Sequence, residues 1–91
     1  MTLKLIDMAK KKLAIFRAGR EENILLESAD IQLGYLSDLL KGKPVDREKI
    51  RQINIGLIAV REIEGIDDEL AELLYEIDYW VRDGIPMENS M

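Results

Sequence analysis

Four stretches of the sequence carry apolar residues at intervals of three and four positions, and a glycine follows each stretch. Such intervals place the apolar side chains on one face of an α-helix. Glycine, followed in two cases by proline, is a common residue at the end of a helix. The predicted helices span residues 2–18, 23–41, 46–64 and 67–83, and residues 87–91 are predicted to be frayed.

The length of the chain sets how these helices can be arranged. Ninety-one residues suffice for one hydrophobic core, so we expect a single domain over residues 1–91. The predicted connections are short, and short connections make neighbouring helices antiparallel. The sequence therefore predicts an all-α fold, a small antiparallel bundle of about four helices.

The third predicted helix is apolar nearly all round at its middle, which is typical of a helix in the centre of a bundle. Its main apolar stripe comprises Ile50, Ile53, Leu57 and Val60, and the apolar residues off that stripe are Ile55, Ile58, Ala59 and Ile63. The β-branched run over residues 53–60 would also suit a buried strand. A helix is favoured because Asp46 suits the N-cap position and no nearby segment offers a pairing strand. Gly56 within this helix predicts a close contact with another helix.

The second predicted helix has two apolar faces. One is a narrow seam, comprising Leu26, Ala29, Leu33, Leu36 and Leu40. Such a seam packs against a neighbouring helix or joins two chains in a homodimer. The opposite face carries Ile24, Ile31 and Tyr35. We expect this second face to pack on the first or fourth helix, with a partner-binding surface as the alternative.

The residue types that most often carry out catalysis are missing from the sequence. It contains no cysteine and no histidine, which removes thiol nucleophiles, disulfides, the commonest general base and the commonest transition-metal ligand. No glycine-rich phosphate-binding loop is present. The clustered Asp67, Asp68 and Glu69 are expected to cap the fourth helix. The prediction is a protein that is not an enzyme and that binds neither a metal nor a cofactor.

The same sequence indicates where the protein is found. The first twelve residues include Asp7 and four lysines, so they lack the unbroken apolar core of a signal peptide. No apolar stretch approaches the roughly 20 residues of a membrane-spanning helix. We therefore expect a cytoplasmic protein without a membrane partner.

Negative charge is concentrated toward the C-terminal end of the chain. Residues 1–60 carry 11 basic and 8 acidic side chains, whereas residues 61–91 carry 2 basic and 10 acidic ones. An acidic surface disfavours nucleic acid and favours a protein partner with a basic surface.

The fourth predicted helix places two aromatic residues within this acidic segment. Tyr75 and Tyr79 are expected to project opposite the core face, which comprises Leu70, Leu74, Ile77 and Val81. The charged residues near the two tyrosines are Asp68, Glu72, Asp78 and Arg82. Tyrosine among charged side chains on an outward face is typical of a protein-binding patch. The alternative is that these tyrosines cover lysine stems or another helix.

Several short runs of the sequence resemble a family of small immunity proteins from bacterial type VI secretion systems. They are Ser28-Ala29, Gln32-Leu33, Tyr35-Leu36, Asp46-Arg47, Ile55-Gly56, Ile58-Ala59-Val60-Arg61-Glu62, Glu69-Leu70 and Tyr79. The likeness runs in register over residues 3–81, and the best-known member of the family neutralises a secreted NAD(P)⁺ glycohydrolase toxin. The resemblance implies a helical protein that binds its cognate toxin, occludes the toxin's active site and protects the cell in interbacterial competition.

The resemblance also implies a partner and places to look for its contacts. The partner would be a toxin domain with a basic cleft, bound one-to-one by an immunity protein that is a monomer when free. Candidate contacts shared with the family pattern are Tyr35, Arg61, Glu62 and Tyr79, to which Ile31 is added on the outer face of the second helix. Two alternatives remain, a helical antitoxin or adaptor for another basic protein and a homodimeric structural module.

Overall fold

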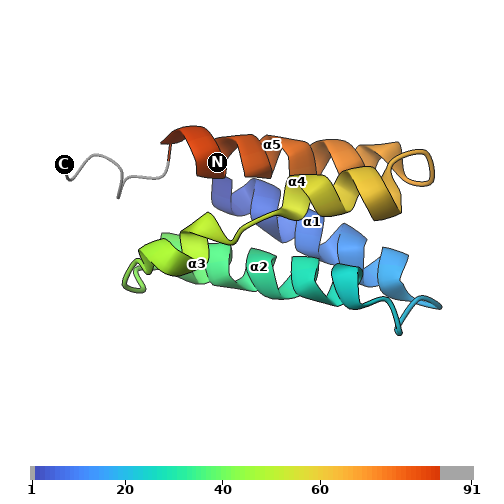
Figure 1. Ribbon diagram of the computed structural model, residues 1–91, viewed down its shortest axis with the longest axis horizontal. Coiled ribbons are helices and arrows are strands. Elements are labelled where there is room, and N and C mark those ends of the chain that lie inside the picture. The colour runs from blue at the N-terminus through green and yellow to red at the C-terminus, as the bar shows by residue number, and fades with distance from the viewer. Residues whose placement is uncertain (1, 85–91) are drawn as a thin grey trace.

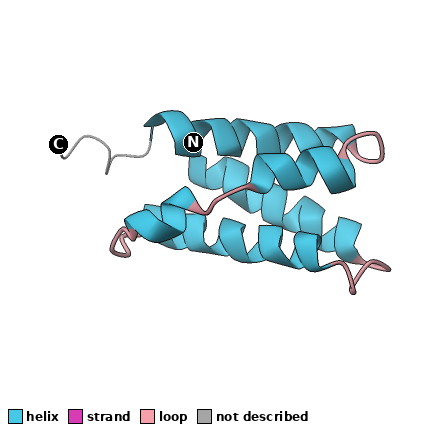
Figure 2. Ribbon diagram, in the orientation of Figure 1, coloured by secondary structure: helices cyan, strands magenta, loops and turns pink. Residues whose placement is uncertain are grey.

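The computed structural model describes residues 2–84, and every regular element in that range is helical. The elements are α1 (Thr2–Arg17), α2 (Ile24–Leu40), α3 (Arg47–Arg51), α4 (Ile55–Ile58), the π-helix η1 (Ala59–Ile63) and α5 (Asp68–Gly84). α1 runs antiparallel to α2, α2 runs antiparallel to the segment formed by α4 and η1, and that segment runs antiparallel to α5, with α4 lying between α2 and α5 (Figure 1). Figure 2 shows loops only at the ends of the bundle and between α3 and α4. The predicted all-α antiparallel fold is confirmed.

The buried apolar faces of α1 and α2 form the contact between these two helices. Ile6, Ala9 and Leu13 of α1 are completely buried, as are Leu26, Ala29, Leu33 and Leu36 of α2. Leu40, which was predicted to continue the seam of α2, is instead 39% exposed because it lies in the last turn of the helix. Since the rest of the seam is buried within the chain, it is not free to join two chains, and the homodimer alternative loses its basis.

The third predicted helix, residues 46–64, does not form as one helix. Asp46 does cap α3, its side chain accepting from the backbone N–H of Glu48 and Lys49. The helix then ends at Arg51, residues 52–54 are not helical, and the chain resumes as α4 and continues into η1. At the break, the backbone N–H of Asn54 donates to Gln32 Oε1 of α2 at 2.8 Å. A partner on another helix therefore replaces the hydrogen bond that a continuous helix would supply.

This break changes which residues of the segment face the core. Leu57 and Val60, predicted to belong to the main apolar stripe, are 50% and 52% exposed, so that prediction was wrong. The buried positions after the break are those placed off the stripe, Ile55, Ile58, Ala59 and Ile63. The stripe was drawn in one helical register through residues 46–64, and the break resets that register.

Gly56 makes the close helix contact that the sequence predicted. A Cβ atom at this position would lie 2.9 Å from both Cγ and Oδ2 of Asp78 on α5. Only a residue without a side chain lets α4 and α5 approach this closely.

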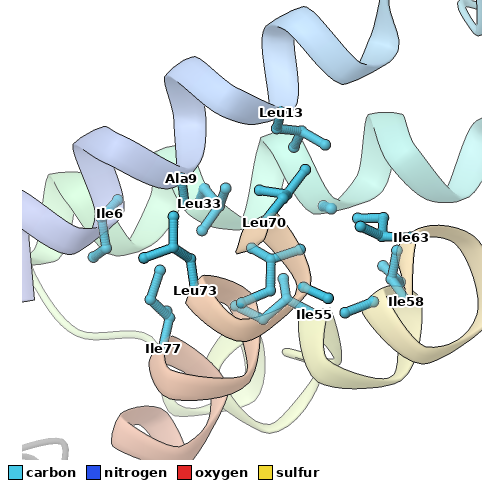
Figure 3. Packing of buried hydrophobic residues seen from close by; sticks show 14 of the residues in the cluster. Ile6, Ala9, Leu13, Leu33, Ile55, Ile58, Ile63, Leu70, Leu73 and Ile77 are labelled. Atoms are coloured by element: carbon cyan, nitrogen blue, oxygen red, sulfur yellow. The ribbon is translucent and has the colours of Figure 1, made fainter. Parts of the chain in front are cut away.

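The helices share one core that runs between them. Figure 3 shows side chains of α1, α2, α4, η1 and α5 meeting there, including Leu13, Leu33, Ile55, Ile63 and Leu70. The predicted core face of α5 is buried, with Leu70, Leu74 and Ile77 at 0% and Val81 at 4% exposure. Over residues 2–84, no helix is long and apolar enough to cross a membrane.

Candidate partner-binding surfaces

The three carboxylates at the start of α5 each have a partner within the chain. Asp67 Oδ1 accepts from the backbone N–H of Leu70 at 3.1 Å, and Asp68 Oδ1 accepts from that of Gly65 at 2.8 Å. Glu69 pairs with Lys12 of α1 at 3.0 Å. Asp67 therefore caps α5 as predicted, whereas Glu69 joins α5 to α1. Nowhere in residues 2–84 do three acidic side chains gather in a way that could hold a metal ion.

Tyr79 and Tyr75 occupy different environments on α5. Tyr79 is 68% exposed, as expected for an outward residue. Tyr75 is half-buried against the core, and its hydroxyl donates to Glu64 Oε1 at 2.9 Å. Desolvation raises the pKa of Tyr75, and the hydrogen bond to Glu64 and the negative charges of Glu64 and Asp68 raise it further. The prediction that Tyr75 projects away from the core was therefore wrong, because its ring packs against the core and its hydroxyl is held by Glu64. Tyr79 is free to meet a partner.

Asp78 does not lie on the outward face beside the tyrosines, where the sequence had placed it. Its side chain is 16% exposed and turned toward Gly56. Oδ2 accepts from Arg82 Nε at 2.8 Å, while Oδ1 is buried and has no hydrogen-bond partner. The side chain of Arg82, which forms this ion pair, is itself 64% exposed. Asp78 therefore belongs to the contact between α4 and α5, because its position on α5 faces α4 rather than solvent.

Two large apolar residues of the same segment of chain as Gly56 are exposed to solvent. Leu57 follows Gly56 directly, and Val60 lies about one turn before Glu64, the residue that receives the Tyr75 hydroxyl. Both are about half exposed. We call the combined surface the α4–α5 face, comprising Leu57, Val60, Arg61, Glu64, Asp68, Glu72, Tyr75, Tyr79 and Arg82. It has apolar and aromatic side chains surrounded by charged ones, the composition of a protein interface. Leu57 and Val60 were missed as surface residues because the break before α4 was not expected.

Arg61 and Glu62 are neighbours in the sequence but occupy different environments. Arg61 is exposed. Glu62 is half-buried, and its Oε1 accepts from Asn23 Nδ2 at 2.8 Å. Asn23 is the N-cap of α2, its Oδ1 accepting from the backbone N–H of Leu26 at 3.1 Å. Glu62 therefore joins η1 to the start of α2, and Arg61 is the one of the pair that a partner can reach.

The second apolar face of α2 forms one wall of a groove of about 440 Å³. We call this the α2 groove, lined by Ile24, Glu27, Ser28, Ile31, Gln32, Tyr35, Lys49, Gln52, Ile53 and Asn54. Ile24 and Ile31 are 76% and 65% exposed. The expectation that this face packs on the first or fourth helix was therefore wrong, because the groove lies against α3 and the break before α4.

Tyr35 and Gln32 fix the shape of the α2 groove. The Tyr35 hydroxyl accepts from the Asp46 backbone N–H at 2.9 Å and donates to the Asp46 carbonyl at 3.3 Å. Lys49 Nζ lies 5.3 Å from the centre of the Tyr35 ring, a cation–π distance. Gln32 Nε2 donates to Asn54 Oδ1 at 2.7 Å, completing a reciprocal pair with the bond from the Asn54 backbone. No single-segment pattern could indicate this groove, because its walls come from two distant parts of the chain.

Comparison with known proteins agrees with the fold and with the resemblance noted in the sequence. The Tsi6 family model matches residues 2–83. The Immune protein Tsi6 of Pseudomonas aeruginosa is 34% identical over 55 residues, which are 60% of this chain and 58% of that protein. That alignment thus spans less than two-thirds of the relative.

The structural match is more extensive. The solved structure of Tsi6 from Pseudomonas aeruginosa matches this chain with a TM-score of 0.76 at 30% identity, covering 89% of this chain and 93% of that one. The helical arrangement and the sequence match therefore extend over nearly all of the described residues. The chain belongs to the Tsi6 family of type VI immunity proteins.

Proposed function

We propose that this chain binds a cognate type VI secreted toxin, an NAD(P)⁺ glycohydrolase, and neutralises it by occluding its active site. Membership of the Tsi6 family supports an immunity role. The observation that carries the proposal is the α4–α5 face, where Tyr79 of α5 is 68% exposed and Leu57 and Val60 of the adjoining α4 and η1 are about half exposed. Large apolar and aromatic side chains in such a place support binding of a protein.

The proposed inhibition is steric and electrostatic, and it requires no catalysis or cofactor from the immunity protein. A cleft that binds a dinucleotide needs cations to hold the phosphates. The carboxylates of Asp68 and Glu72 on the α4–α5 face would occupy the positions of those phosphates. Tyr79 would serve as the anchor, because tyrosine supplies a large contact area with only two torsions to immobilise. The complex would contain one copy of each protein.

The test measures binding and NAD⁺ protection with the purified toxin domain encoded beside the gene for this chain. Tyr79→Ala should weaken binding by at least about 2 kcal/mol, roughly thirtyfold, as expected for a hot-spot residue. Tyr79→Phe retains the ring and should lose far less. Neither change should alter the melting temperature, because the side chain is largely exposed.

The outcomes separate the parts of the proposal. Wild-type binding without protection of NAD⁺ would contradict the occlusion of a glycohydrolase and favour the adaptor alternative. Tyr79→Ala that binds and protects like wild type would exclude Tyr79 as the anchor.

A further inference from the structure

The α2 groove carries two charges that the described part of the chain leaves without ion-pair partners. They are Glu27 and Lys49, neither of which contributes to the four ion pairs found within residues 2–84. Glu27 lies on α2 one turn after Ile24, and Lys49 lies over the ring of Tyr35. Positions 27 and 35 are separated by about 12 Å along the helix, at 1.5 Å per residue. The groove is therefore negative toward one end and positive toward the other.

Between these charges the groove is apolar. Ile24 and Ile31 stand along its α2 wall, largely exposed, and Ile53 also lines it, with only 6% of its surface accessible. A large aliphatic pair kept in water is unfavourable for a protein that stays alone. A concave apolar site between two unpaired charges fits a polypeptide segment that bears one apolar side chain between two charged ones.

The α2 groove and the α4–α5 face are joined by a short stretch of chain. Asn54 lines the groove, Gly56 contacts α5 two residues later, and Leu57 follows on the α4–α5 face. In Figure 1 the segment joining α3 to α4 crosses from the side of α2 to the side of α5. One partner that covers the α4–α5 face could therefore also contact the groove across residues 54–57.

We propose that the α2 groove is a second docking site for the same toxin, an inference that rests on the proposed function. Its occupant is a toxin segment with an aliphatic or aromatic side chain seated between Ile24 and Ile31. A basic toxin residue on this segment faces Glu27, and an acidic one about 12 Å away faces Lys49. Contacts in the groove thus fix the position of this toxin segment along α2, in addition to the contact that Tyr79 makes.

The test compares the double variant Ile24→Ala/Ile31→Ala with Met8→Ala/Ile15→Ala on α1. Both pairs are seven residues apart on one helix, and all four residues are exposed. The groove variant should raise the Kd for the purified toxin domain about tenfold or more, as for loss of interface anchors, and the α1 variant should stay within about twofold. Lys49→Glu should also weaken binding. Circular dichroism and melting temperature should be unchanged in each variant.

Failure of this inference is distinct from failure of the proposed function. Suppose that wild type binds the toxin and Tyr79→Ala weakens this binding, but the groove variant has the same Kd as the α1 variant. Only the groove inference is then overturned. If the groove variant changes self-association instead of toxin affinity, the occupant is a second copy of this chain and the inference is wrong. If wild type does not bind the toxin, the proposed function itself is contradicted.

Discussion

Gly56 and Asp78 show how one pair of residues sets the distance between two helices. The glycine leaves room for a carboxylate whose Oδ2 is bound by Arg82 and whose Oδ1 has no partner. A methyl group at position 56 would come within 2.9 Å of the carboxylate and 3.2 Å of Asp78 Cβ. The carboxylate would have to turn away, losing its hydrogen bond to Arg82, or the helices would have to separate.

We expect Gly56→Ala to destabilise the protein by up to about 2 kcal/mol. Overpacking costs about 1–3 kcal/mol, and the gain in helix propensity of about 1 kcal/mol offsets part of that cost. In an Asp78→Ala background the two atoms at 2.9 Å are gone and only the Cβ atom at 3.2 Å remains, so adding Gly56→Ala should cost less than it does in the wild type. Urea unfolding of the two single variants and the double variant measures this coupling. Additive effects would show that the contact does not limit the approach of α4 to α5.

At the scale of elements, the sequence predicts helices well where each helix is specified by its own residues. The helices α1, α2 and α5 begin and end within one residue of the predicted ranges. The prediction of one helix over residues 46–64 was wrong because the break before α4 depends on Gln32, a residue of α2 that binds the Asn54 backbone. Periodicity within one segment cannot reveal a hydrogen bond from another segment.

The candidate surfaces follow the same rule. Exposure of Tyr79 could be predicted from its position on one regular helix, and the structure agrees. Exposure of Leu57 and Val60 could not, because it depends on the break, and the α2 groove could not because two distant segments form it. Asp78 was misplaced since its turn toward α4 depends on the glycine opposite.

The reset register after the break can be tested with two neighbouring residues. Ile58 is 1% exposed and Leu57 is 50% exposed. Ile58→Ala should lower the free energy of unfolding by about 2–5 kcal/mol, as large-to-small core substitutions do. Leu57→Ala should cost well under half as much, because most of its side chain already contacts water. Chemical denaturation of both variants decides the register, and equal losses would place Leu57 in the core.

At the scale of the whole molecule, opposite charges are separated onto different helices. The helix α5 carries six acidic side chains and one arginine, whereas α1 carries five basic side chains and one aspartate. The two helices pack side by side, with Lys12 and Glu69 paired between them. The outer side of α5 nevertheless keeps Asp68, Glu72 and Glu76 exposed. This arrangement creates a negative field on the side that carries Tyr79.

A negative field around the α4–α5 face should guide a basic toxin surface during association. Complementary charges at the edge of an interface act mainly on the association rate, and salt screens them over about 8 Å at physiological ionic strength. Stopped-flow mixing should therefore show association slowing as salt rises, while dissociation changes less.

Glu72→Lys should slow association several-fold and weaken its salt dependence. Asp7→Lys on α1 changes the net charge equally but lies on another helix, so its association rate should stay close to that of wild type. Equal slowing by the two variants would mean that only net charge matters, and a rate independent of salt would contradict electrostatic guidance altogether.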